Sequence, residues 1–234
     1  MNNEYHYKDI TYQLKQSDRK TTSIYIERDG SVTVLAPSPF TLDKIEHLLE
    51  KKRRWIYRHL AEWQDINRTR CRNKQYVNGE SFLYLGRQYQ LQLVKNPTEV
   101  LQLLKGRFCL AEKAVPKATV HFKQFYKARL ELKLAERLPS LASAMGVTPS
   151  AIGVMELQHR WGSCSPQKAL HFHWKCAMMP LSILDYIIVH ELAHLKEPHH
   201  TARFWYIVER SMPDYQQHKT WLKYNGASLS LASS

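Results

Sequence analysis

The chain of 234 residues lacks several features that define specialised classes of protein. It contains no run of about 18 apolar residues, so no membrane-spanning helix and no membrane partner are expected. The first residues, Met1–His6, are polar and include no apolar signal core, so export is not expected either. We find no internal repeat of fixed period and no low-complexity stretch. These absences favour an ordinary soluble, cytoplasmic globular protein.

Closely spaced cysteine pairs are also missing. The four cysteines lie far apart in the sequence, with no C-x-x-C pair: Cys71, Cys109, Cys164 and Cys176. A disulfide framework or a zinc ribbon needs closer spacings than these. The sequence therefore predicts four reduced thiols, in agreement with a cytoplasmic location.

Acidic residues are scarce relative to basic ones, at 21 against 34, which gives a formal net charge of +13. A field of this sign attracts polyanions, so nucleotides or nucleic acid are possible partners. The basic residues cluster in Lys51–Arg54 with Arg58, and again from Arg68 to Lys74. The competing interpretation is a solvated helix face followed by a mobile basic loop.

The pattern of apolar residues predicts an α+β fold in two parts. Residues 1–115 read as a β-rich N-terminal region that contains one long helix, from about residue 42 to residue 65. Pro116 marks the boundary that we predict between the two parts. Residues 116–234 read as a helical domain with a small sheet, in which 118–144 form a long helix closed by Gly146. The strand around Leu170–Lys175 alternates apolar and polar residues.

The stretch His190-Glu191-Leu192-Ala193-His194 has the form H-E-x-x-H. Residues four apart lie on one face of a helix, so His190 and His194 can present two imidazoles to one metal ion. Glu191 stands where such sites keep the general base that takes a proton from a water activated by the metal. The pattern alone is common in proteins, so its context decides its meaning.

The helix around this pattern is strongly apolar, with Ser182 as its expected N-cap and Asp185 completing a capping box. Two histidines and a glutamate in a buried helix are costly unless partners satisfy them, and a metal would do so. A catalytic zinc usually has three protein ligands and one open position. The residues downstream offer three candidates for the third ligand: His199, His200 and Glu209.

His200 stands where the metzincin signature H-E-x-x-H-x-x-G-x-x-H places its third histidine. That signature uses a glycine for its sharp turn, whereas Glu197 and Pro198 occupy the turn here. The chain is therefore not a standard metzincin, and it must reverse direction in another way.

Several stretches together resemble the YgjP-like family of zinc-dependent metallopeptidases, which is related to SprT-like proteases. The resemblance covers essentially the whole chain, and its specific residues are the runs 160–164 (Arg-Trp-Gly-Ser-Cys) and 185–195, His200, and Phe204-Trp205. It implies a zincin-like catalytic domain with Zn²⁺ held by His190, His194 and His200. The family usually has Asn before the third histidine, and His199 replaces it here.

The function that follows is a zinc metallohydrolase, most simply a metallopeptidase acting on protein or peptide, with Glu191 as its catalytic residue. Arg160, Ser163 and His173 are candidates for oxyanion or substrate contacts. Alternatives are a nucleoside triphosphate hydrolase, a SprT-like protease acting on nucleic-acid-associated proteins, and a binding module with a structural metal. The sequence does not identify the natural substrate or the oligomeric state.

Overall fold

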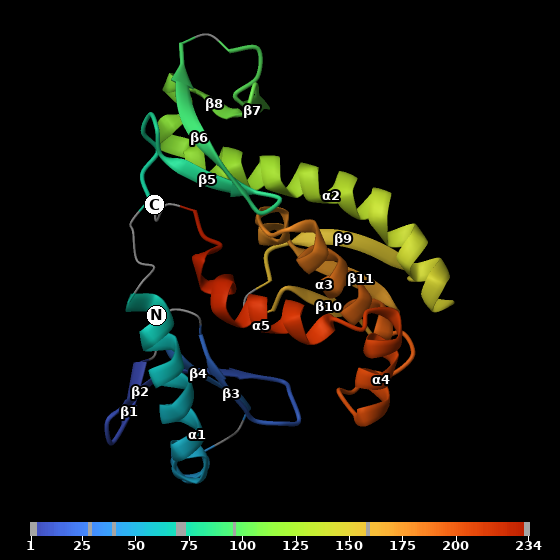
Figure 1. The fold of residues 1–234 in the computed structure, drawn as a ribbon. Coiled ribbons are helices and arrows are strands. Elements are labelled where there is room, and N and C mark those ends of the chain that lie inside the picture. Colours follow the sequence, from blue (N-terminus) through green and yellow to red (C-terminus); the bar gives the residue numbers. More distant parts are fainter. Residues whose placement is uncertain are drawn as a thin grey trace. The chain divides into compact units, whose positions relative to one another are not determined.

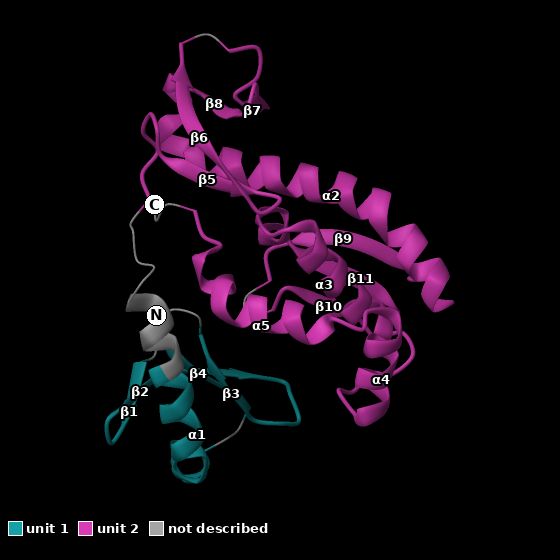
Figure 2. Cartoon of the chain, viewed as in Figure 1, with its two compact units in different colours: residues 1–71 teal, residues 72–234 magenta. Residues whose placement is uncertain are grey.

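The computed structural model describes residues 4–27, 30–38, 41–68, 74–95, 97–157 and 160–231. The contacts divide the chain into two compact units, residues 1–71 and residues 72–234 (Figure 2). The fold is α+β, as the sequence predicts, with small sheets in the N-terminal region and helices toward the C-terminus (Figure 1). No helix in the described part of the chain is both long enough and apolar enough to cross a membrane.

The first unit is a four-stranded sheet followed by a long helix. Its elements are β1 (Glu4–Tyr7), β2 (Ile10–Ser17), β3 (Ser23–Ile26), β4 (Val32–Pro37) and α1 (Leu42–Arg68). The strand order is β1-β2-β4-β3, with antiparallel outer pairs and a parallel inner pair. Alternate residues of the strands pack with Ile45, Leu49 and Ile56 of α1 in a separate hydrophobic core.

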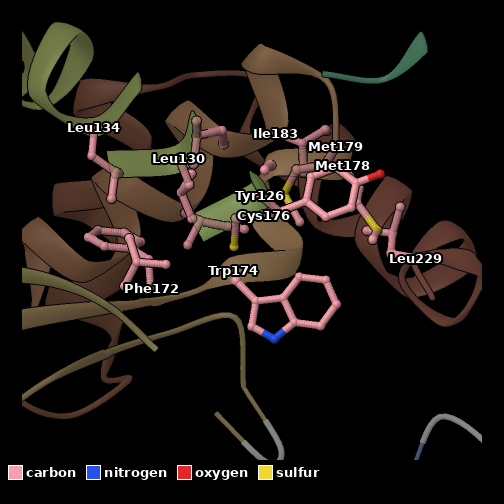
Figure 3. Close-up of a cluster of buried hydrophobic side chains, with 14 of the residues drawn as sticks. Tyr126, Leu130, Leu134, Phe172, Trp174, Cys176, Met178, Met179, Ile183 and Leu229 are labelled. Atoms are coloured by element: carbon pink, nitrogen blue, oxygen red, sulfur yellow. The ribbon is translucent and has the colours of Figure 1, made fainter. Parts of the chain in front are cut away.

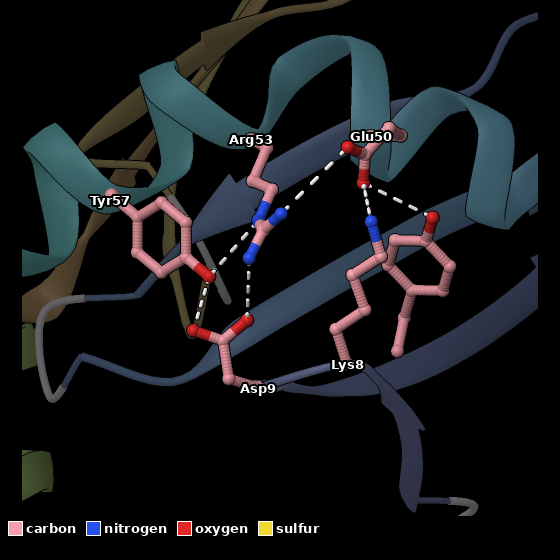
Figure 4. Close-up of polar contacts among 6 residues, drawn as sticks. Lys8, Asp9, Glu50, Arg53 and Tyr57 are labelled. Atoms are coloured by element: carbon pink, nitrogen blue, oxygen red, sulfur yellow. Dashed lines mark hydrogen bonds and ion pairs between the residues drawn. The ribbon is translucent and has the colours of Figure 1, made fainter.

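The basic residues of α1 do not all have the same surroundings. Lys51, Arg54 and Arg58 are exposed and share one face of the helix by their spacing of three and four residues, and Lys52 is exposed beside them. Arg53 differs, because its guanidinium pairs with Asp9 at 3.3 Å and with Glu50 at 3.8 Å (Figure 4). Tyr57 also donates a hydrogen bond to Asp9. Arg53 therefore fixes α1 to the turn between β1 and β2.

The second unit begins with another four-stranded sheet: β5 (Ser81–Tyr84), β6 (Arg87–Val94), β7 (Leu101–Leu104) and β8 (Arg107–Ala111). Its order, β5-β6-β8-β7, repeats that of the first sheet, again with a parallel inner pair. A long helix follows each sheet, α1 with 27 residues and α2 (Ala118–Met145) with 28. The two units thus share one arrangement of four strands and a helix.

The sequence carries a trace of this repetition. The first hairpin contains Tyr7 followed by Tyr12-Gln13-Leu14, and the second contains Tyr84 followed by Tyr89-Gln90-Leu91 at the same spacing. In both hairpins the first tyrosine ends the short strand and a two-residue turn follows it. Lys8 and Leu85 occupy the first turn position with positive φ values of 52° and 48°. We infer that the sheet and its helix are duplicated within the chain, although no fixed-period repeat is visible in the sequence.

The remaining elements build the helical part around α2. They are the 3-10 helix η1 (Glu112–Lys117), β9 (Ala151–Met155), β10 (Gly162–Cys164), β11 (Ala169–His173), η2 (Trp174–Met178), α3 (Leu181–Ala193), α4 (Ala202–Ser211), α5 (Tyr215–Asn225) and η3 (Gly226–Ser228). Tyr126, Leu130 and Leu134 of α2 lie among Phe172, Trp174 and the methionines of η2 (Figure 3). Gly146 closes α2 with φ 62°, as predicted.

The boundary that we predicted between residues 115 and 116 does not coincide with this division into units. Strands β5 to β8 share one hydrophobic core with α2 and α3, through residues such as Phe82, Phe108 and Phe122. The rings of Phe82 and Phe122 are 4.5 Å apart. The second sheet therefore packs with the helical part, and Pro116 lies inside η1 rather than in a linker.

Three local predictions are corrected by the structure. Helix α3 has Pro180 as its N-cap with no side-chain cap, and Asp185 instead binds Arg137 of α2. The stretch from Arg160 to Pro166 has the Gly, Ser and Pro residues typical of a loop, but it contains β10, because Gly162–Cys164 pair with β11. Lys74, predicted in a mobile basic loop, places its ammonium 5.3 Å from the Phe82 ring. Residues 69–73 of that loop lie outside the described residues.

Candidate metal centre

Helix α3 carries the first two histidines and the glutamate. Its apolar residues, Ile183, Leu184, Ile187, Ile188 and Leu192 among them, are buried in the main core. His190 and Glu191 occupy the last turn of α3, and His194 is its C-cap residue. This placement confirms the expected helix, which ends at Ala193, five residues before Pro198. Because the apolar side chains of α3 are packed into the core, the helix cannot rotate, and the directions of the polar side chains in its last turn are fixed.

His200 completes a cluster of three imidazoles. One ring nitrogen from each of His190, His194 and His200 lies within 4.8 Å of the other two. The Nε2 atoms of His190 and His200 are 3.0 Å apart. The structure therefore brings the third histidine of the predicted set to the first two, across the turn between α3 and α4.

The reversal of the chain needs no glycine. None of residues 194 to 201 has a positive φ angle. The chain leaves α3 through the hydrogen bonds that the N–H groups of Lys196 and Glu197 donate to the Ala193 carbonyl. Thr201 then caps α4 by accepting a hydrogen bond from the N–H of Phe204 at 3.4 Å. A turn that contains Glu197 and Pro198 can thus reverse the chain and bring His200 to the first two histidines.

The protonation of the three imidazoles suits a metal site. Burial is the main cause that lowers the pKa of His190 to about 3, and the neighbouring His194 and His200 lower it further. Burial also lowers the pKa of His194 and that of His200. The Nδ1 atom of His194 lies 3.1 Å from the Glu197 carbonyl, which can only accept, so Nδ1 carries the proton and Nε2 has a free lone pair. At neutral pH the cluster therefore offers uncharged nitrogen donors.

Aromatic rings enclose this cluster. The Phe204 ring is fully buried and lies 4.9, 4.5 and 4.7 Å from the rings of His190, His194 and His200, respectively. Trp205 stacks on His200 at 5.7 Å with an interplanar angle of 27°. Phe204 is part of the core, as the sequence indicates, and it also holds all three imidazoles in position.

Glu191 directly follows His190 on α3 and is buried, with 5% of its surface exposed. Burial raises the pKa of its carboxyl group to about 8, and the positive charge of Arg160 opposes this rise. Its carboxyl group lies directly against Gly162 of β10, where a Cβ atom would be 2.5 Å from Oε1. The carboxyl group thus lies between its own helix and the strand that follows the Arg160–Trp161 pair.

Strand β10 leaves one edge of its backbone unpaired. The sheet order is β10-β11-β9, so β10 is an outer strand, and no described strand pairs with its other edge. The Trp161 carbonyl accepts from the N–H of His173, and the N–H of Ser165 donates to Ala169. In an antiparallel pair the hydrogen-bonded positions alternate, so the backbone N–H and C=O groups of Ser163 also point toward β11. The backbone groups of Gly162 and Cys164 consequently face away from the sheet.

The other candidate residues have different surroundings. Arg160 is exposed and acts electrostatically on Glu191. Ser163 projects from the face of β10 opposite to Gly162, and so away from Glu191. His173 is buried, accepts a hydrogen bond on Nδ1 from the Lys175 N–H, and packs 6.1 Å from Trp161. Arg160 is thus the one of the three candidates with a described interaction with Glu191.

His199 and Glu209, the alternative third ligands, are both exposed. The described histidine nitrogens that converge come from His190, His194 and His200, and neither His199 nor Glu209 joins them. His199 lies close enough to lower the pKa of His194 electrostatically. We therefore prefer His200 as the third donor.

Two residues near the cluster were not predicted from the sequence. Gly162 belongs to the conspicuous run 160–164, and a glycine between Trp and Ser could have indicated a close backbone approach. Lys219 of α5 lies with its ammonium 4.3 Å from the centre of the Trp205 ring. Nothing in the sequence marks Lys219, because it is one of many basic residues on a basic chain.

The donor set fits a zinc ion. Nitrogen atoms that face one another at 3.0 Å, in a cluster that burial keeps uncharged, need a shared proton or a cation between them. Three neutral imidazoles are a common ligand set for catalytic zinc, and they leave a position open. The facing Nε2 atoms of His190 and His200 are thus more completely satisfied with a cation between them than without one.

One comparison with known proteins identifies a family. Curated proteins gave no match. A solved structure with some likeness is the metallopeptidase zymogen of Pyrococcus abyssi abylysin, at 20% sequence identity and a TM-score of 0.36; the match covers 38% of this chain and 90% of that one. The family model described as YgjP-like, metallopeptidase domain, matches residues 20–225, which is most of the chain. The chain therefore belongs to the YgjP-like family of metallopeptidase domains.

Proposed function

We propose that the protein is a zinc-dependent peptidase in which His190, His194 and His200 hold the ion and Glu191 is the general base. The observation that carries this proposal is the convergence of the three imidazoles, together with the burial of Glu191, which directly follows His190 on α3 and contacts Gly162 of β10. When bound, the ion would supply a Lewis acid that makes water more acidic and polarises a carbonyl group.

Glu191 is suited to move a proton in this setting. Its carboxyl group is buried, and its raised pKa, about 8, is near the working range of a general acid or base. A cation bound by the neighbouring imidazoles would favour the carboxylate form, which accepts a proton. The same carboxyl group can then deliver the proton to the leaving amine. Contact with Gly162 leaves Glu191 little room for other positions.

An extended peptide fits the unpaired edge beside Glu191. Gly162 and Cys164 present backbone N–H and C=O groups that β11 does not use. Addition of a strand to such an edge uses main-chain hydrogen bonds and is a common mode of peptide binding. Because Gly162 contacts Glu191, a peptide paired with this edge would run past the general base. This favours a peptide over other hydrolysable substrates.

The test compares the zinc-loaded protein with its Glu191→Gln variant on an unfolded protein such as reduced, alkylated casein. We expect the variant to keep zinc and to lose at least about 1,000-fold in rate, because it cannot accept the proton. The exposed Glu209→Gln is the matched control and should cleave normally. Equal turnover by Glu191→Gln would contradict the mechanism. Release of phosphate from nucleoside triphosphates, with casein left intact, would favour the phosphoanhydride hydrolase instead.

A further inference from the structure

Lys219 lies at the metal centre without being one of its donors. Its ammonium is 4.3 Å from the ring of Trp205, and that ring stacks on His200 and lies 5.9 Å from His190. Trp205 also stacks on the buried Tyr215, one helical turn before Lys219 on α5, at 5.5 Å. Lys219 contacts the Trp205 ring, and this ring contacts His200. These contacts link α5 to the imidazole cluster.

The charge of Lys219 has no counterpart in the described part of the chain. No described carboxylate forms an ion pair with it, and Asp214 on the same helix pairs with His218 at 3.2 Å. Lys219 acts electrostatically on His190 and on His200, which places its charge close to the cluster. Arg160 acts in the same way on Glu191. Positive charge thus borders the site on both sides.

This arrangement favours the binding of an anion at Lys219. Arg160 acts on the carboxyl group of Glu191, whereas the exposed ammonium of Lys219 forms no ion pair with a described carboxylate. A dication bound by the three imidazoles would repel this ammonium. Contact with the Trp205 ring holds the ammonium in place, since cations are attracted to the face of an indole. A negatively charged group of the substrate would be attracted both to Lys219 and to the bound dication.

We propose that Lys219 is a specificity-determining residue that binds a carboxylate of the peptide substrate close to the bond that is cut. The inference rests on the proposed peptidase function. The carboxylate could be an acidic side chain or the C-terminal carboxylate of a short peptide, and both would make the same charge-assisted hydrogen bond with the ammonium.

The experiment uses two sets of fluorogenic peptides with the whole zinc-loaded protein. In one set a single Glu replaces Gln at successive positions of an amidated peptide, and in the other the C-terminus is either free or amidated. For Lys219→Gln we expect the ratio of kcat/KM between the best acidic peptide and its neutral counterpart to fall about tenfold. Lys219→Arg should restore the ratio and Lys219→Glu should invert it. The set that responds identifies the source of the carboxylate.

Lys223→Gln is the matched control, because Lys223 lies one turn further along α5 and over Tyr224 instead, at 5.8 Å. It removes the same charge from the same helix and should leave the ratio unchanged. An unchanged ratio in Lys219→Gln would overturn the inference. A change of equal size in Lys223→Gln would overturn it as well, because the effect would then be one of net charge.

Two binding measurements separate this inference from the proposed function. Fluorescence anisotropy with zinc-loaded Glu191→Gln reports binding of labelled acidic and neutral peptides without turnover, and Lys219→Gln in that background should reduce the preference for the acidic peptide. Lys219→Gln should also bind zinc about two- to fivefold more tightly at low salt, since a repelling charge is gone. If the wild type cleaves no peptide, the proposed function fails, whereas an unchanged preference in anisotropy refutes the role of Lys219.

Discussion

Gly162 lies directly against the carboxyl group of Glu191: a Cβ atom at residue 162 would be 2.5 Å from Oε1 and 2.7 Å from Cγ of Glu191. No pair of nonbonded atoms of this kind tolerates such a distance, so one of the two groups would have to move. Gly162 has no side chain because the general base that we propose occupies that space. The glycine in the run 160–164 is thereby explained by packing rather than by backbone flexibility.

Gly162→Ala should therefore damage activity more than stability or metal binding. The added methyl group would displace the Glu191 carboxyl group by about 1 Å, and a displacement of that size can cost about 100-fold in rate. We expect kcat to fall by about that factor while zinc content stays the same. Gly153→Ala on β9 is a matched control, because its new Cβ would meet only the His171 ring edge, at 3.2 Å. Full activity in Gly162→Ala would show that the position of Glu191 is not important.

His199 and His200 offer a direct test of the ligand set, because they are adjacent and chemically identical. His200→Ala removes a nitrogen that converges with those of His190 and His194, whereas His199→Ala removes one that does not. We expect zinc affinity to fall more than about 100-fold in the first variant, since loss of even a ligand's hydrogen-bond partner costs about 10- to 100-fold. The second variant should stay within about threefold of the wild type. Competition with a chelating dye measures both, and equal losses would exclude the proposed set.

Metal binding should release a proton from Glu191 and not from His190. The lowered pKa of His190, about 3, leaves this imidazole already uncharged at pH 7 in the metal-free protein. Burial raises the pKa of Glu191 to about 8, so its carboxyl group holds a proton at pH 7, and a bound cation would expel it. Calorimetry in buffers of different ionisation enthalpy counts the protons. We expect wild type to release about one proton more than Glu191→Gln at pH 7, and this difference should shrink above pH 9. No difference at pH 7 would show that Glu191 is already ionised.

The periodic parts of the fold could be predicted from the sequence. The apolar spacing of α2 and α3, the glycine that closes α2, and the alternation in β11 are local properties, and each gave the correct type of element. The strand ends earlier than predicted, because Trp174 and Lys175 belong to η2. Strand β10 could not be found in this way, because three residues carry no period and its pairing depends on β11. The division into units was missed for a related reason: the packing of β5 to β8 with α2 involves residues that are distant in sequence.

The candidate site could be predicted only in part, for the same physical reason. His190 and His194 are brought together by a single helix turn, so their spacing within a strongly apolar helix indicates the site. His200 needed the turn after α3, and the structure shows that this turn forms without the glycine that a metzincin requires. Lys219 reaches the cluster only through Trp205 on another helix, and no sequence spacing reports such a contact.

The ion pair between Arg137 and Asp185 should stabilise the contact between α2 and α3 without taking part in the chemistry. Both nitrogens of one side of the guanidinium bond both carboxylate oxygens, and the side chains are 33% and 13% exposed, respectively. Arg137→Met would leave a largely buried carboxylate without its partner, which costs about 2 kcal/mol of unfolding free energy once solvent screening is allowed for. Urea unfolding of the whole chain, followed by near-ultraviolet circular dichroism, measures the change.

The double variant distinguishes a lost ion pair from lost packing. Arg137→Met with Asp185→Leu removes both charges, so no unpaired carboxylate remains and most of the stability should return. The more exposed pair of Lys133 and Glu136 on α2 provides the control, and Lys133→Met should leave the free energy of unfolding nearly unchanged. All these variants should retain kcat, because Asp185 lies more than a helical turn before His190 and binds α2 rather than the imidazole cluster. A double variant less stable than Arg137→Met alone would mean that Asp185 contributes chiefly through packing that leucine cannot replace.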